Sequence, residues 1–312
     1  MAEPILNQPH FQDASKAREY LEAIRWANGQ PCPHCGSLGK HYKLEGVSHR
    51  PGLYKCVDCR EQFTVTVGTV FERSKIALHL WLQVTYLMSA SKKGISAKQI
   101  ERMLGVTYKT AWFMCHRVRE AMREEQYGQL GGAGKIVEAD ETYYGREDNS
   151  SKRTKPLKPG AALVEANKIV SLVERGGKVR SFHVTDVTGP NLKAILEAQI
   201  HADSHLMTDA SPRYNSVKRA PNFAGYDQVN HSKKEYARGI AHSNTVEGYF
   251  SVLKRGLIGT FHHVSPQHLH RYTNEFDFRY NNRSALGVDD IQRTDNLLAS
   301  ISGKRLMYRR PS

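Results

Sequence analysis

What the sequence has little of sets the first limits on function. No stretch approaches the roughly 18 consecutive apolar residues of a membrane-spanning helix, and the first residues lack the basic and apolar segments of an export signal. Acidic side chains are also scarce: 31 Asp and Glu stand against 45 Lys and Arg, a net charge of +14. We therefore expect a soluble, intracellular protein whose charge favours a polyanionic partner, either nucleic acid or an anionic membrane surface.

Cysteine is scarce as well, and four of the five cysteines lie in two close pairs. Each pair has the C-x2-C spacing, and the four residues are Cys32, Cys35, Cys56 and Cys59. Two such pairs can wrap one tetrahedral zinc ion, and four thiolates leave no open position for catalysis. Disulfides are the less favoured alternative in a chain without an export signal. We therefore predict a structural Zn²⁺ site, with His34 as an alternative ligand, and a core position for the remaining Cys115.

The chain is long enough for two or three compact units. A Gly-rich segment, QYGQLGGAGK, separates a region of cysteines and helical periodicity from one in which strands precede alternating helices, the pattern of a mixed α/β domain. A polar, basic stretch in this second region, REDNSSKRTKPLKPG, is predicted to be a mobile surface loop. The predicted divisions are a leading helix (1–30), a cysteine-rich ribbon (31–72), a helical domain (73–125), a linker (126–135), the α/β domain (136–283) and a basic C-terminal tail (284–312).

The helical domain contains a pattern typical of a helix-turn-helix. Ser96 begins an S-x-x-Q capping box, and Gly105 turns the chain into a second helix that begins near Thr107. The face of this helix opposite its apolar stripe could meet phosphates or base edges, and we expect it to contain Lys109, Trp112, His116 and Arg119. An ordinary solvated face is the alternative for each residue alone. Together with the cysteine cluster and the charge, the pattern favours DNA over a membrane as the partner.

Three acidic residues stand where carboxylates could bind a metal ion. Asp140 lies on an apolar strand, IVEADETYYG, and Asp209 ends another, HLMTDAS. If these strands are neighbours in one sheet, the two carboxylates lie side by side, and such a pair needs a raised pKa or a cation. Glu247 opens a helix in HSNTVEGYFSVLKRG. Three carboxylates can hold two Mg²⁺ or Mn²⁺ ions of the kind that assist phosphoryl transfer.

Two further residues of the Glu247 helix extend this predicted site. Lys254 lies two turns after Glu247 on nearly the same face, where its charge could hold a DNA phosphate. Asn244 lies one turn before Glu247 and could assist as a ligand or position DNA, although the N-cap of the helix is the favoured interpretation.

Taken together, these strings resemble a known family. VEADETYYG, MTDAS, NHSKKEYARG, AHSNTVEGYFSVLKRG and FHHVSPQHLHRYTNEFDFRYNNR look like the core of bacterial insertion-sequence transposases with a DDE-type, ribonuclease H-like domain. The cysteine cluster, TVFERSKIALHLWL and ISAKQIERMLGVTYKTAW resemble the amino-terminal part of the ISXO-like group. The resemblance covers about residues 15–283. It implies a multidomain fold: a zinc ribbon, a helix-turn-helix-like domain and an α/β ribonuclease H-like domain with a mixed sheet.

The resemblance also implies an activity. Asp140, Asp209 and Glu247 would be the metal-binding catalytic residues and Lys254 their basic partner, while His231 would line the DNA or support the fold. The protein would bind terminal inverted repeats, free a 3′ hydroxyl by hydrolysis and direct it at a target phosphodiester. Pairing two DNA ends implies at least a dimer, acting in the bacterial cytoplasm at the nucleoid.

Two alternatives remain open at this point. A sequence-specific DNA-binding regulator would explain the first 122 residues equally well, but it leaves the three acidic residues and Lys254 as a coincidence. A ribonuclease H-like nuclease that cuts without joining would use the same three carboxylates, because cutting and strand transfer differ only in the nucleophile.

Overall fold

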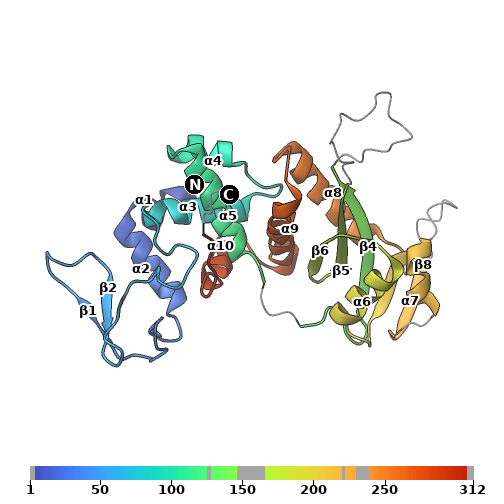
Figure 1. The fold of residues 1–312 in the computed structure, drawn as a ribbon, viewed down its shortest axis with the longest axis horizontal. Coiled ribbons are helices and arrows are strands. Elements are labelled where there is room, and N and C mark those ends of the chain that lie inside the picture. Colours follow the sequence, from blue (N-terminus) through green and yellow to red (C-terminus); the bar gives the residue numbers. More distant parts are fainter. Residues whose placement is uncertain (1–3, 125–127, 146–165, 220–221, 230–238, 308–312) are drawn as a thin grey trace, which may run out of the picture. The chain divides into compact units, whose positions relative to one another are not determined.

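The described residues form two compact units (Figure 1). In the computed structural model these residues are 4–124, 128–145, 166–219, 222–229 and 239–307. Unit 1 combines residues 1–124 with 282–312, and unit 2 spans residues 125–281. The predicted loop at 146–160 and His231 lie outside the described residues. None of the described helices is long and apolar enough to cross a membrane.

Unit 1 begins with short helices and a small sheet. After the 3-10 turn η1 (Ile5–Asn7) and α1 (Pro9–Gln12), helix α2 (Ala14–Arg25) starts at Asp13, whose carboxylate accepts hydrogen bonds from the backbone N–H groups of Ser15 and Lys16. Three antiparallel strands follow in the order β1 (His41–Leu44), β2 (Leu53–Cys56) and β3 (Gln62–Phe63).

Three helices complete the first segment of unit 1: α3 (Leu78–Ala90), α4 (Ala97–Leu104) and α5 (Tyr108–Ala121). The Ser96 hydroxyl accepts from Gln99 N, as the capping box requires. Gly105 ends α4 with φ 65°, a left-handed conformation that glycine adopts without steric cost, and Thr107 caps α5. Helices α4 and α5 therefore meet across a turn of residues 105–107.

The last segment of the chain returns to unit 1. It contains the 3-10 turn η5 (Ser284–Leu286) and helix α10 (Asp290–Ala299), where the sequence analysis expected a basic tail. Helix α10 packs against α3 and α2, and Leu297 and Leu298 are fully buried. Beyond the helix, the ammonium group of Lys304 donates to the backbone O of Ala121 at the end of α5. Residues far apart in sequence thus share one core.

Unit 2 is built on a five-stranded mixed sheet in the order β6-β5-β4-β7-β8. The first three strands are antiparallel, whereas β4, β7 and β8 run parallel. The bounds are β4 (Ile136–Tyr144), β5 (Asn167–Glu174), β6 (Val179–Val184), β7 (His205–Asp209) and β8 (Gly225–Val229). The predicted mixed sheet is confirmed.

Helices cover both faces of this sheet. Helices α8 (Asn244–Gly259) and α9 (Pro266–Asn281) bury one apolar cluster against β5 and β6. Helices α6 (Gly189–Gln199) and α7 (Asn215–Arg219), with the turn η3 (Pro212–Tyr214), bury another that includes Val137 and Ala139 of β4. Because side chains alternate along a strand, Glu138 and Asp140 lie on the face covered by α8.

Candidate active site and metal centre

The four paired cysteines form one cluster in unit 1. Their sulfur atoms all lie within 4.8 Å of one another, and none forms a disulfide. The Sγ–Sγ separation is 3.6 Å for Cys32 and Cys59 and 3.7 Å for Cys35 and Cys56. Four sulfurs at about 2.3 Å from a tetrahedral zinc would be about 3.8 Å apart. The cysteines are therefore arranged to hold a zinc ion, as predicted.

The charge balance of the cluster also suits a dication. Hydrogen bonding with the side chain and the backbone of Ser37 lowers the pKa of Cys35 to about 6. The pKa of Cys59 rises to about 12, because burial and the other three cysteines outweigh the lowering effect of the Glu61 backbone N–H. The thiol of Cys59 thus loses its proton against neighbouring sulfur charge, which zinc would neutralise. His34 is exposed and its ring contacts the backbone O of Gln62, outside the cluster.

The sheet of unit 2 places Asp140 beside Asp209. Strands β4 and β7 are parallel neighbours whose last paired residues are Ala139 and Thr208, and the two aspartates are the next residues along. The predicted adjacency of the two strands is correct. Asp209 ends β7, whereas β4 continues for four residues beyond Asp140 to Tyr144. Each carboxylate accepts one nearby backbone N–H, from Glu141 to Asp140 and from Ser211 to Asp209.

Asp140 sits in an environment that disfavours its charge. Burial raises its pKa to about 7, although the backbone N–H of Glu141 lowers it, and the charges of Asp209, Glu141 and Glu247 raise it further. The carboxylates on β4, β7 and α8 therefore interact electrostatically. Among the described residues, the four cysteines are the one group of three or more ligand side chains close enough to hold a metal ion, and the three carboxylates do not form such a group.

Helix α8 carries the third predicted acid. Glu247 lies in its first turn, exposed to solvent, and its Oε1 accepts a hydrogen bond of 2.7 Å from the hydroxyl of Ser243. Ser243 occupies the N-cap position, so the predicted cap at Asn244 is wrong by one residue: Asn244 is the first residue of the helix. Lys254 is exposed two turns further along α8.

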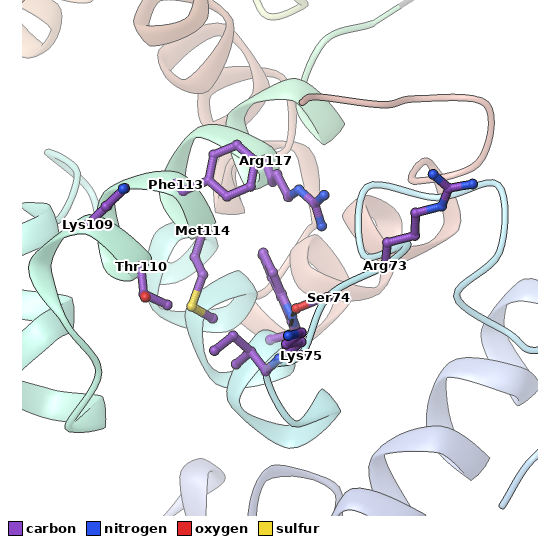
Figure 2. A pocket seen from close by; sticks show the side chains of 10 residues that line it. Arg73, Ser74, Lys75, Lys109, Thr110, Phe113, Met114 and Arg117 are labelled. Atoms are coloured by element: carbon purple, nitrogen blue, oxygen red, sulfur yellow. Dashed lines mark hydrogen bonds between the residues drawn. The ribbon is translucent and has the colours of Figure 1, made fainter. Parts of the chain in front are cut away.

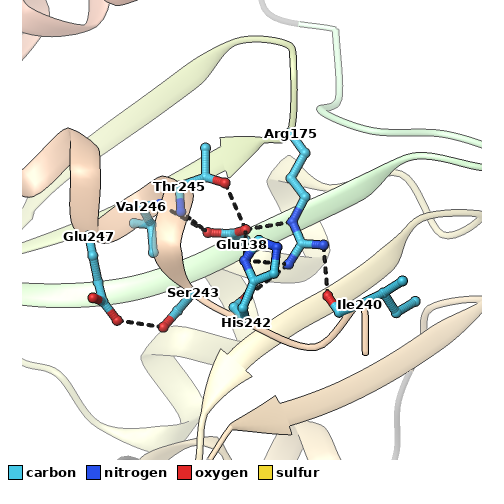
Figure 3. Close-up of polar contacts among 8 residues, drawn as sticks. All are labelled: Glu138, Arg175, Ile240, His242, Ser243, Thr245, Val246 and Glu247. Atoms are coloured by element: carbon cyan, nitrogen blue, oxygen red, sulfur yellow. Dashed lines mark hydrogen bonds and ion pairs between the residues drawn. The ribbon is translucent and has the colours of Figure 1, made fainter. Parts of the chain in front are cut away.

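Glu138, an acid of β4 without a predicted role, holds the start of α8 (Figure 3). Its carboxylate is fully buried and accepts hydrogen bonds from the backbone N–H of Thr245 at 2.8 Å and of Val246 at 2.9 Å. The Thr245 hydroxyl adds a third at 2.8 Å. A carboxylate at a helix N-terminus satisfies N–H groups that have no partner within the helix. The strand that carries Asp140 is thereby fixed to the helix that carries Glu247.

Arg175 neutralises this buried carboxylate. Its Nε donates to Glu138 at 2.5 Å, while its two Nη atoms donate to the backbone O atoms of Ile240 and His242, each at 2.8 Å (Figure 3). The His242 ring lies 3.3 Å from the same carboxylate. Because a buried charge without a partner costs several kcal/mol, Glu138 and Arg175 together fix the loop that leads into α8.

The predicted DNA-facing side of α5 is only partly correct. Lys109 is exposed and Trp112 is half-buried, whereas His116 and Arg119 are 1% and 2% exposed, so their predicted exposure is wrong. Helix α5 packs against both α3 and α4, and residues 300–304 contact its C-terminal end. Other segments of the chain therefore cover faces of α5 beyond its apolar stripe. That stripe, which contains the predicted Cys115, is buried as expected.

The signal that could have pointed to Glu138 is its spacing. It precedes Asp140 by two residues on a strand whose residues Val137 and Ala139 are apolar, so both acids share one face. A buried strand carries a second acid on its covered face only when a partner satisfies it. The partner, Arg175, lies in the turn that follows β5, and nothing in its local sequence marks it.

Comparison with known families finds one matching domain in each of the two units. Residues 129–281 match the ISXO2-like transposase domain, and residues 12–62 match the transposase zinc-ribbon domain. The chain contains an ISXO2-like transposase domain preceded by a transposase zinc ribbon. The resemblance seen in the sequence is thereby confirmed.

This chain is only distantly similar to individual known proteins. It is 28% identical over 279 residues to an uncharacterized protein in transposable element ISH50 of Halobacterium salinarum, covering 86% of this chain and 91% of that protein. Solved structures match weakly. A simian T-cell lymphotropic virus intasome in complex with PP2A regulatory subunit B56 gamma gives a TM-score of 0.31 at 13% identity, covering 74% of each chain. The Mos1 strand transfer complex gives 0.22 at 12% identity, covering 66% of this chain and 77% of that one.

Proposed function

We propose that this chain is a DDE-type DNA transposase that binds the terminal inverted repeats of an insertion sequence and catalyses metal-dependent strand cleavage and strand transfer. One observation carries the proposal. Asp140, Asp209 and Glu247 come from β4, β7 and α8, and their charges act on one another at the edge of a single sheet. A DNA-binding regulator would have no need for three carboxylates whose charges act on one another.

The residues present fit Mg²⁺ or Mn²⁺. Carboxylate oxygens are the ligands that these ions prefer, whereas the thiolate cluster in unit 1 suits zinc. Burial is the main cause of the raised pKa of Asp140, and the charges of Asp209, Glu141 and Glu247 raise it further. A dication would balance that negative charge. Asp140, Asp209 and Glu247 would hold the ions. Bound in this way, the ions would activate the attacking oxygen and stabilise the leaving oxygen of the phosphodiester.

Other residues of the chain would position these groups and the DNA. Glu138 keeps α8 docked on β4, and the Ser243 hydroxyl orients the carboxylate of Glu247. Lys254 lies about 10 Å along the same helix from Glu247, at 1.5 Å for each residue, where its charge would hold a phosphate beside the scissile bond. Asn244, at the first position of α8, is exposed and would contact the same strand of DNA.

Unit 1 would recognise the terminal inverted repeats of the insertion sequence. The zinc ribbon and the α4–α5 pair, in the role of a helix-turn-helix, would place Lys109 and Trp112 near the backbone or base edges of the repeats. Each end needs its own copy of unit 1, so the working assembly would be at least a dimer on the chromosome.

The test is cleavage of a labelled DNA fragment that carries the flanking sequence of this gene, with Mg²⁺ or Mn²⁺. Discrete, metal-dependent nicks at the repeat ends should appear with the natural chain and disappear with Asp209→Asn, which keeps the shape but removes the charge. The Asp186→Asn variant is the matched control, because Asp186 is a 63% exposed acid in the same unit. Cleavage retained by Asp209→Asn would remove the proposed site. Nicks without any joined product would instead indicate a nuclease.

A further inference from the structure

Unit 1 contains a pocket that lies outside the zinc ribbon and shares only Lys109 with the predicted recognition face (Figure 2). It has a volume of about 270 Å³ and lies between residues 73–76, the start of α3 and one face of α5. Its polar lining includes four cations and no acid: Arg73, Lys75, Lys109 and Arg117. We call this the basic pocket.

The two lysines and Arg73 are exposed side chains at the rim of the basic pocket, whereas Arg117 is half-buried. Arg117 is held in place by four contacts. Its Nη1 donates to the backbone O of Glu72 at 3.0 Å and its Nε to that of Leu306 at 3.3 Å. Its guanidinium also lies 4.9 Å from the ring centre of Phe113 and 5.9 Å from that of Trp81. Among the described residues, these bonds leave Nη2 for a ligand, so the guanidinium is preorganised to bind an acceptor oxygen.

The charge around the basic pocket is unbalanced. Burial and the charge of Arg305 lower the pKa of Arg117, although the charge of Glu72 opposes them. The carboxylate of Glu72 is itself engaged, since it accepts from Gly68 N and pairs with Arg73 at 3.5 Å. Arg73 also adopts φ 56°, a left-handed conformation that is uncommon for residues other than glycine. An anion in the pocket would relieve the repulsion between these cations.

We propose that the basic pocket binds one phosphodiester group of DNA, with Arg117 and Lys109 contacting its oxygens and Lys75 adding charge at the rim. This inference rests on the proposed function, because it names DNA as the ligand of unit 1. The volume lies at the low end of the range for small-molecule pockets, which suits a phosphodiester with part of its sugar better than a whole cofactor. The apolar lining offers a surface for the deoxyribose.

The basic pocket also corrects the predicted face of α5. Lys109, Phe113 and Arg117 recur at intervals of four residues, so they form one stripe of the helix. The predicted contacts at His116 and Arg119 lie on another, buried side. The backbone of DNA would therefore meet α5 along the stripe that starts at Lys109.

The experiment measures DNA binding by the full-length, zinc-loaded chain at a series of salt concentrations, by fluorescence anisotropy of a labelled fragment carrying the gene's flanking sequence. Each phosphate contact contributes about 0.9 to the slope of log affinity against log salt. Lys75→Gln and Lys109→Gln should each weaken binding by about five- to tenfold near 0.1 M salt and reduce the slope by about one. Arg117→Lys keeps the positive charge but removes the planar guanidinium with its several N–H donors. Binding should therefore weaken with little change in the salt slope.

Lys16→Gln is the matched control, because Lys16 is a 57% exposed lysine of α2 outside the pocket. Its affinity and slope should equal those of the natural chain. Equal losses in this control would indicate diffuse charge and overturn the basic pocket, as would an unchanged slope in both pocket variants. Circular dichroism and zinc content show whether each variant folds.

Two further arms separate the sources of failure. Titration of the natural chain with inorganic phosphate alone should show only weak binding; tight binding that both lysine variants lose would reassign the pocket to a free phosphate ligand. The cleavage assay is run on the same preparations. If the natural chain cleaves DNA and the pocket variants bind DNA as tightly as it does, the basic pocket is refuted and the proposed function stands. If the pocket variants show a smaller salt slope but the natural chain does not cleave DNA, the proposed function is refuted and the basic pocket stands.

Discussion

Asp140 predicts a pH dependence of stability that is opposite to that of most carboxylates. Its pKa is raised to about 7, chiefly by burial and then by neighbouring acids, against 3.8 for an unperturbed group. A group whose pKa is higher in the folded state binds its proton more tightly there, so the protonated form favours folding. This contribution is complete below pH 3.8, is lost as the pH rises toward 7, and stays lost above it.

The size of the effect follows from the two pKa values. The difference between 3.8 and about 7, at about 1.4 kcal/mol for each pH unit, corresponds to about 4 kcal/mol in the free energy of unfolding. Asn cannot ionise and has nearly the same shape. Without added Mg²⁺, the Asp140→Asn variant should therefore be more stable than the natural chain by about 3–5 kcal/mol at pH 8 and nearly equal to it at pH 4.

Urea unfolding of the zinc-loaded, full-length chain provides the measurement. The three tryptophans, Trp26, Trp81 and Trp112, all lie in unit 1, so tryptophan fluorescence follows unit 1 while circular dichroism follows both units. Added Mg²⁺ should stabilise the natural chain at pH 8 and leave Asp140→Asn unchanged. The reasoning is refuted if the two proteins differ equally at both pH values, or if the natural chain is the more stable one at pH 8 without Mg²⁺.

Three more predictions concern residues that hold the fold and the site. Glu138→Gln should lower the free energy of unfolding of unit 2 by about 3–5 kcal/mol, because its arginine partner stays buried without a counter-charge; a change below about 0.5 kcal/mol in urea unfolding would contradict this. Cys35→Ser should lose the bound zinc in metal analysis, while Cys115→Ser should keep it. Leu297→Ala should shift the fluorescence transition of unit 1 by about 2–5 kcal/mol, since the side chain is fully buried. Leu286→Ala, at a 36% exposed position, should leave that transition in place.

The features that sequence analysis found are those that depend on near neighbours. Capping at Ser96 is a matter of three or four residues, and so is the spacing of the cysteine pairs. The adjacency of β4 and β7 was also predictable, because an acid on each of two apolar strands is best accommodated when one cation serves both. The mixed sheet follows from the same succession of strands and helices.

The features that it missed depend on which distant segment covers a given surface. Helical periodicity shows that His116 lies off the apolar stripe, but it does not show that further parts of the chain pack there. The basic residues of the C-terminal segment led to the prediction of a tail. Helix α10 forms there instead, because Leu297 and Leu298 are buried. Glu138 has its partner 37 residues away, in the turn that follows β5, beyond the range of any local pattern.

The return of α10 to unit 1 makes the folding of the amino-terminal unit depend on residues that are synthesised after unit 2. Until residues 290–304 have left the ribosome, α3 has no cover where α10 will pack and Ala121 lacks its bond from Lys304. A product terminated before α10 would carry the cysteine cluster and the sheet of unit 2 but an unfinished unit 1. Under the proposed function, such fragments would compete poorly for DNA ends, so nonsense copies of the gene would interfere little with intact ones.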